Sequence, residues 1–167
     1  MSGKQPKRKD RPGVDRMGRM PLHYAALDGD AASVRQSLAS GVIADAPDDN
    51  GMTPLHFAAQ SNAADAAALL LNAGATADAR DAHGNTPLST AVFNSRGYGE
   101  VIKLLRAHGA DPYAKNNHGV SPLSLARTIA NFDVRQFFQG LPEESERVKG
   151  TQFIPKSSDN VKAVYEI

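Results

Sequence analysis

The sequence contains no cysteine and no tryptophan, and aromatic residues make up only 6% of its 167 positions. Without cysteine there is no disulfide framework, thiolate metal site or thiol nucleophile, which fits a reducing compartment such as the cytoplasm. The most apolar run, residues 66–71, is far too short to span a bilayer. No apolar stretch follows the basic residues at the N-terminus, so we expect no secretory signal. These absences predict a soluble, cytoplasmic protein.

An excess of charge of one sign is also absent, because 19 Lys and Arg residues nearly balance 18 Asp and Glu residues. The distribution is uneven, however. Residues 1–19 carry seven basic against two acidic side chains, a net charge of +5, and the rest of the chain carries −4. Residues 1–14 lack apolar periodicity and are predicted to form a basic, disordered arm. The arm offers charge for phosphates but no aromatic ring to stack on bases, which favours a solubilising tail over a nucleic-acid or membrane contact.

The sequence lacks every common catalytic motif that we sought. It has no nucleophile elbow, phosphate-binding loop, His-Glu-x-x-His pair or dinucleotide fingerprint. Carboxylates such as Asp48, Asp49 and Asp81 lie in turn sequences, where aspartate more often caps its own backbone than acts as an acid or base. We therefore expect a protein that is not an enzyme and that binds no cofactor.

The sequence does contain a repeat. Gly18, Gly51, Gly84 and Gly119 are spaced by 33, 33 and 35 residues, and a proline follows each of them three residues later. Self-similarity at a fixed interval of this size is typical of stacked repeat arrays. The four prolines lie in one shared frame, which reads Met20-Pro21-Leu22-His23, Thr53-Pro54-Leu55-His56, Thr86-Pro87-Leu88-Ser89 and Ser121-Pro122-Leu123-Ser124.

This frame resembles the ankyrin repeat, a turn followed by two helices over about 33 residues. The resemblance implies an all-α repeat fold, an α-solenoid of four ankyrin repeats with capping end repeats. Each repeat would comprise a helix-turn-helix and a β-hairpin turn. The predicted domain covers residues 15–141, with repeats at about 15–47, 48–80, 81–115 and 116–141. A stand-alone array rich in Ala and Arg also resembles small bacterial ankyrin-repeat proteins.

The expected helix boundaries follow from local chemistry. Thr53, Thr86 and Ser121 can cap a first helix that begins at the following proline, whereas Met20 cannot. The second helix of each repeat should end where a glycine adopts a left-handed conformation. These glycines are Gly41, Gly74 and Gly109.

The two end repeats depart from the pattern of the interior ones. Ser33 and Ser37 make one face of the first repeat polar, and Arg127 and Arg135 occupy places that are apolar in the interior repeats. Because an unpaired buried arginine is very costly, the array is predicted to stop there. Residues 142–167 are then a C-terminal tail. We expect it to dock on the last repeat, with a partner-binding peptide or a loose segment as alternatives.

Five histidines raise the question of a metal site. His23 and His56 occupy equivalent places in successive repeats, and packed helices lie about 8–10 Å apart, whereas zinc needs ligand atoms at about 2.1 Å. The resemblance implies that both are structural hydrogen-bonding residues, so we expect no metal. His83 and His118 lie at predicted hairpin tips and are as suited to partner contact as to a neutral role.

The third repeat is two residues longer than the first two, and the extra length falls at residues 94–99. Arg96 and Tyr98 in this segment are residue types enriched at binding hot spots, and a neutral loop extension is the equal alternative. The resemblance further implies that partners contact the hairpin tips and exposed first-helix ends of a concave face. In this sequence the predicted contact residues are Met17, Arg19, Leu27, Asp28, Asp49, Asn50, Met52, Gln60, Ser61, His83, Asn85, Phe93, Asn94, Arg96, Tyr98 and His118.

We therefore predict a non-catalytic protein–protein interaction module, an adaptor or inhibitor that is monomeric when alone. Met17, Leu27, Met52 and Phe93 are larger apolar side chains than solvated tips need, which favours a protein partner over scattered surface hydrophobics. One alternative is an immunity protein that neutralises a bacterial toxin, suggested by the small size and by an acidic patch of Asp45, Asp48 and Asp49. A second alternative is nucleic-acid association through the basic arm.

Overall fold

A computed structural model of the chain describes residues 12–129 and 132–142. The predicted basic arm up to Arg11 and the predicted tail from Glu143 onward lie outside the described residues. The expectations for the arm and for docking of the tail therefore stay predictions. What the structure describes is nearly the whole of the predicted repeat domain.

Across the described part of the chain, regular structure consists of seven α-helices and one 3₁₀ helix, with no β-strand. The predicted hairpins are present as turns closed by backbone hydrogen bonds, such as the N–H of Asp81 to the C=O of Asn85 at 3.0 Å. The elements are α1 (Pro21–Asp28), α2 (Ala31–Ala39), α3 (Pro54–Gln60), α4 (Ala64–Asn72), α5 (Pro87–Asn94), α6 (Glu100–Ala107), α7 (Pro122–Thr128) and η1 (Val134–Phe138).

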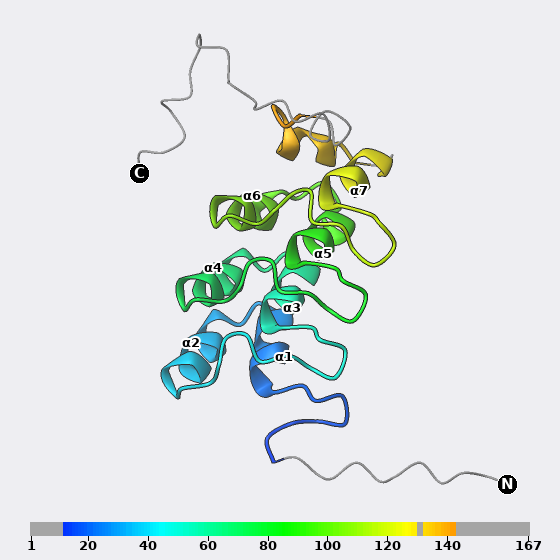
Figure 1. Cartoon of the computed structure of the whole chain (residues 1–167). Helices are drawn as coiled ribbons and strands as arrows, with labels where there is room; N and C mark the ends of the chain where they lie inside the picture. The colour runs from blue at the N-terminus through cyan, green and yellow to red at the C-terminus, as the bar shows by residue number, and fades with distance from the viewer. Residues whose placement is uncertain (1–11, 130–131, 143–167) are drawn as a thin grey trace, which may run out of the picture.

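The helices form two parallel columns (Figure 1). In the inner column α1 packs on α3, α3 on α5 and α5 on α7, and in the outer column α2 packs on α4 and α4 on α6. The turns project from the side of the inner column (Figure 1). After three helix pairs, α7 is followed by the 3₁₀ helix η1 in place of a second α-helix. The result is the predicted all-α solenoid.

The core explains why the two columns stay in register. Small residues such as Ala26, Ala59 and Ala91 are fully buried in the inner helices, which lets neighbouring helices approach closely. The outer helices fill the remaining space with larger side chains, among them the fully buried Leu70 and Ile102. Both columns contain large buried residues, such as Leu55 in α3 and Leu70 in α4, and the alanines lie where neighbouring helices approach most closely.

The C-terminal end of the array differs from its predicted register by one residue. Val134 is fully buried, whereas the side chain of Arg135 is 69% exposed, so Val134 and not Arg135 takes the place of Val34 in the first repeat. A 3₁₀ helix has three residues per turn, and η1 therefore presents different positions to α7 than an α-helix would. The guanidinium of Arg106 lies 5.4 Å from the ring centre of Phe138 and so covers this end with charge.

Candidate partner-binding surface

Each turn at the edge of the inner column begins with an aspartate or asparagine that organises it. Asp48 Oδ1 accepts the backbone N–H of Asn50 at 2.8 Å and that of Met52 at 2.9 Å. The same pair of bonds, to the residues two and four positions later, recurs at Asp15, Asp81 and Asn116. The interpretation of Asp48 and Asp81 as turn caps is confirmed. Four turns, which we call the tip row, thus have one geometry: residues 15–19, 48–52, 81–85 and 116–120.

The turns of the tip row are bonded to one another through their backbones. The N–H of Asp49 donates to the C=O of Met17, that of Ala82 to Asn50 and that of Asn117 to His83, at 2.8, 2.8 and 2.9 Å. Three predicted contact residues, Met17, Asn50 and His83, therefore occupy equivalent places in a bonded series. Such a surface is organised before any partner arrives, which lowers the entropy cost of binding.

Two buried histidines tie the inner helices to the tip row. His56 Nδ1 accepts the backbone N–H of Thr53 at 3.1 Å, and Nε2 lies 3.1 Å from the C=O of Asn85 in the next turn. Because a carbonyl only accepts, Nε2 carries the hydrogen and the ring is neutral. His23 makes the equivalent bonds, from the N–H of Met20 and to the C=O of Met52. The predicted structural role of both histidines is confirmed.

Burial of the two rings is the largest cause that lowers the pKa of His23 and of His56 below the ordinary value of 6.5. A histidine with a lowered pKa binds fewer protons when folded than when unfolded. The contribution of these two histidines to the free energy of unfolding is therefore fully present above about pH 6.5. It is lost progressively as the pH falls below that value.

We expect the free energy of unfolding to decrease between pH 7.5 and pH 5.5, by at most about 1.4 kcal/mol per pH unit for each of these histidines. Urea unfolding at several pH values measures this slope. His56→Ser copies the residue present at the equivalent places Ser89 and Ser124, and it should reduce the slope to about half. An unchanged slope in this variant would show that His56 does not carry the effect.

Serine replaces the histidine in α5, and different bonds join the third and fourth turns. Arg80 Nη1 donates to the C=O of Lys115 at 2.7 Å, and Asn116 Nδ2 donates to Asn85 Oδ1 at 2.8 Å. Asn117 Nδ2 also donates to the C=O of Ala82 at 3.1 Å. Side chains of the turns themselves thus replace the link that a histidine provides in α1 and α3.

The structure places the predicted contact residues in two groups. Ten are exposed: Met17, Asp28, Asn50, Gln60, Ser61, His83, Phe93, Arg96, Tyr98 and His118. Six are half-buried: Arg19, Leu27, Asp49, Met52, Asn85 and Asn94. We use the name tip-and-inner-helix face for the surface formed by the tip row together with the exposed positions of α1, α3, α5 and α7.

Several of the half-buried residues stabilise this face by contacts with neighbouring turns and with the core. Arg19 Nε donates to Asp48 Oδ2 at 3.2 Å, and its guanidinium lies 5.1 Å from the ring centre of Phe57. Met52 packs against the core, and Asn85 Oδ1 is engaged by Asn116. These side chains are less available to a partner than their turn positions predict, because each turn packs on its neighbours.

The predicted acidic patch is largely engaged within the fold. Asp48 is only 6% exposed and forms the ion pair with Arg19. Both carboxylate oxygens of Asp45 accept the backbone N–H of Thr76, at 2.8 and 3.0 Å. Asp49 is half-buried, and its backbone N–H donates to the C=O of Met17. The patch is therefore not the open anionic surface that the sequence suggests.

Tyr24 is an exposed aromatic on the tip-and-inner-helix face that the sequence analysis missed. It is 40% exposed, and its hydroxyl donates to Asp15 Oδ2 at 2.5 Å, the largest of the causes that lower the pKa of Asp15. Its position in the repeat gives no signal of this exposure, because the aromatic residue at the same position of α3 is only 3% exposed. The equivalent residues of α3 and α5 are Phe57 and Thr90.

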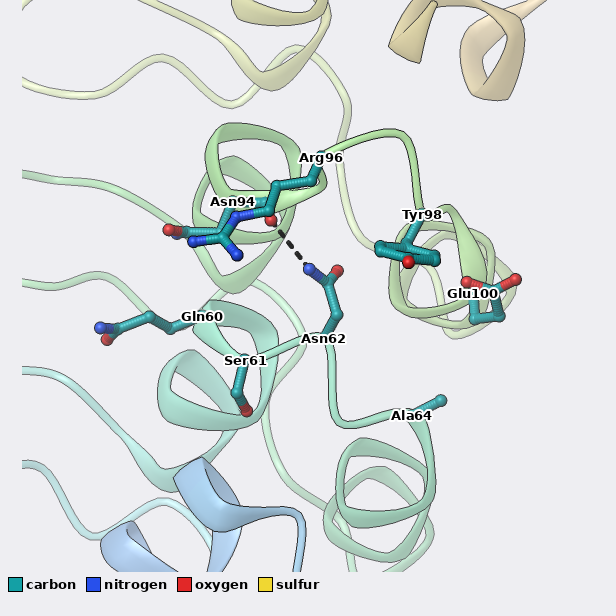
Figure 2. Close-up of a pocket in the computed structure, with 8 residues that line it drawn as sticks. All are labelled: Gln60, Ser61, Asn62, Ala64, Asn94, Arg96, Tyr98 and Glu100. Carbon is teal, nitrogen blue, oxygen red and sulfur yellow. Dashed lines mark hydrogen bonds between the residues drawn. The ribbon is translucent and has the colours of Figure 1, made fainter. Parts of the chain in front are cut away.

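A polar groove lies at the edge of the array where α3 turns into α4 and α5 turns into α6. The turn of residues 61–63 forms its floor, and the longer turn of residues 95–99 overhangs it. We call this space, of about 440 Å³, the loop groove (Figure 2). Asn62 Nδ2 donates to the C=O of Asn94 across it at 2.8 Å. The insertion predicted at residues 94–99 therefore creates a distinct surface feature.

Two further observations concern residues 12–129 and 132–142 alone. Within these ranges no three His, Asp or Glu side chains are grouped so that they could hold a metal ion. No helix in the same ranges is both long and apolar enough to cross a membrane.

Helix pairs stacked through small inner residues, with a bonded row of turns along one edge, define an α-solenoid repeat protein. The chain belongs to the ankyrin-repeat family, because a family model described as ankyrin repeats in three copies matches residues 6–81 and 22–116. Ankyrin repeats are in general modules of protein–protein interaction and not enzymes. No curated protein matches the chain.

Proposed function

We propose that this protein binds a protein partner through its tip-and-inner-helix face, as a non-catalytic adaptor or inhibitor. The observation that carries the proposal is Phe93, which is 73% exposed at the C-terminal end of α5. At the same place in α1, Leu27 packs against the core, and in α3 the place is taken by Gln60. A phenylalanine that is exposed to solvent at this place adds little to the packing of the core, and it suits contact with an apolar surface of a partner.

The direction in which side chains point at this place in the inner helices supports the assignment of Phe93 to the tip-and-inner-helix face. Figure 2 shows that the side chains of Gln60 and Asn94 extend away from Ala64 and Glu100, where the outer helices begin. Phe93 occupies in α5 the register of Gln60 in α3, so it belongs to the side on which the tip row lies. Together with Met17, Tyr24 and Val120, it gives the face four exposed large apolar side chains above a bonded framework.

We expect Phe93→Ala to weaken partner binding by about tenfold, as loss of an aromatic hot spot does. Ile43→Ala is the matched control, because Ile43 is 72% exposed in the loop after α2, away from the inner helices. The immobilised full chain captures a partner that mass spectrometry identifies, and titration of that partner then ranks the two variants. Both should retain the melting temperature of the unchanged chain. Equal affinity of the two variants would exclude this face as the binding surface.

Tyr98→Ala and Met52→Ala extend the same experiment. Tyr98 is 63% exposed and lines the loop groove instead of the tip-and-inner-helix face, so its replacement should weaken binding, without loss of stability, only if the partner also reaches the groove. Met52 packs against the core, and its replacement should lower the melting temperature as well. The pair separates contact with a partner from support of the turn.

Toxin neutralisation would be one form of this function, since an immunity protein inhibits by covering its target. The acidic patch that motivated it is weakened as an argument by the engagement of Asp45 and Asp48. Nucleic-acid association through residues 1–14 depends on a segment almost wholly outside the described residues. We therefore propose the general binding role, and the captured partner identifies its biological setting.

A further inference from the structure

The loop groove gathers both of the strained non-glycine residues in the described part of the chain. Asn62 has a backbone φ of 56° and Arg96 a φ of 47°, and both residues line the groove. A left-handed backbone brings the Cβ close to the following carbonyl oxygen and is therefore disfavoured for residues with a side chain, with asparagine tolerating it better than arginine. Such strain concentrates at functional sites, where the surrounding structure maintains it.

Among the residues described, two buried side-chain polar atoms lack a hydrogen-bond partner, Asn62 Oδ1 and Ser95 Oγ. Asn62 lines the groove, and Ser95 directly precedes the lining residue Arg96. The bond from Asn62 Nδ2 to Asn94 orients the amide and leaves Oδ1 on the side of Tyr98 (Figure 2). Native structures rarely leave such atoms unsatisfied without a reason.

The groove also carries two exposed charges without a partner in the described structure. Arg96 and Glu100 form no ion pair or hydrogen bond there, and Figure 2 shows Tyr98 between them. A guanidinium offers planar, paired donors that match a carboxylate. The carboxylate of Glu100, on the other side of Tyr98, would repel a second negative charge of a ligand. This repulsion disfavours a polyanion such as nucleic acid. The exposed ring of Tyr98 provides an apolar wall between the two charges.

We propose that the loop groove binds an extended segment of the protein partner that carries one carboxylate side chain. A carboxylate side chain of this segment pairs with Arg96, an aliphatic portion packs on Tyr98, and a neutral or basic residue faces Glu100. This inference rests on the proposed binding function and adds a second contact site. The site lies on the helix-turn edge of the array and shares only Gln60 with the tip-and-inner-helix face.

Two blocked peptides test the proposal by NMR titration of the ¹⁵N-labelled full chain at millimolar peptide. They are acetyl-Glu-Ala-Gly-Lys-amide and its counterpart with Gln in place of Glu. We expect shift changes confined to residues 60–64 and 94–100, and a dissociation constant about threefold lower for the Glu peptide, as for an exposed ion pair. Arg96→Gln should abolish this difference. Arg35→Gln, which removes an exposed arginine of α2, should preserve it.

The proposal would be overturned if the two peptides bound with equal affinity, or if the difference in affinity persisted in Arg96→Gln. It would also be overturned if the shift changes fell elsewhere in the protein or if there were none. None of these outcomes affects the binding proposed for the tip-and-inner-helix face, because that function is tested by Phe93→Ala with a captured protein. Conversely, Phe93→Ala and Ile43→Ala could bind the partner equally while the Glu peptide still binds more tightly than the Gln peptide in an Arg96-dependent way. That result would support the loop groove as a binding site and contradict the proposal for the tip-and-inner-helix face.

Discussion

His56→Ala should lower the free energy of unfolding by about 3 kcal/mol, the largest effect that we expect from one substitution outside the apolar core. The ring is fully buried and links α3 to the turn that contains Asn85. Its removal leaves the N–H of Thr53 and the C=O of Asn85 without this partner and opens a cavity between two repeats. Unsatisfied buried groups cost about 1–3 kcal/mol each in proteins, and the cavity adds to that cost.

Urea unfolding monitored by circular dichroism measures this loss. His118→Ala is the matched control, because His118 is exposed at the fourth turn and should change stability by no more than about 0.5 kcal/mol. A loss below about 1 kcal/mol in His56→Ala would mean that water replaces both hydrogen bonds and that the link between repeats is dispensable.

The helix starts and helix ends were predictable because their signals are local. Proline fixes its own φ, and it begins α1, α3, α5 and α7 as the repeated frame predicts. Left-handed glycines end the outer helices at the expected places. The N–H of Gly74, for example, donates to the C=O of Leu71, and the N–H of Ala75 reaches Leu70. Each of these features depends on residues within one or two turns of the chain.

The exposure of the turn residues was not predictable in the same way. The contacts that engage Arg19, Met52 and Asn85 come from residues about one repeat away, such as Asp48 and Asn116. A sequence pattern places a residue in a turn but does not show which neighbouring turn covers its side chain. For this reason the predicted contact set mixes exposed residues with supporting ones.

The loop groove was predictable only in part. The two additional residues of the third repeat located the insertion, and the structure confirms that it lies between α5 and α6. The bond between Asn62 and Asn94 joins two repeats, and the backbone strain at Asn62 and Arg96 has no sequence signal beyond asparagine's tolerance of positive φ. The chemistry of the groove therefore depends on contacts between repeats that a sequence pattern does not show.

Gly84→Ala should be the second most damaging of these substitutions, with a loss of about 2 kcal/mol or more. Gly84 has a φ of 77°, and an added Cβ would lie 2.9 Å from the backbone nitrogen of Asn117. That nitrogen donates to the C=O of His83, so the clash falls on the bond that joins the third and fourth turns. The same Cβ would lie 2.5 Å from Asn117 Oδ1, in a side chain that can rotate away, whereas the backbone nitrogen can move only if the two turns separate.

Gly74→Ala separates the two components of this effect. Gly74 has a φ of 89°, but an added Cβ there meets no atom within 4 Å, so only the backbone conformation is penalised, by about 1 kcal/mol. Equal losses in the two variants would show that the contact between turns contributes nothing. A larger loss in Gly84→Ala, together with weaker binding of the captured partner, would link the tip row to recognition. Gly74→Ala lies at the end of an outer helix and should leave that affinity unchanged.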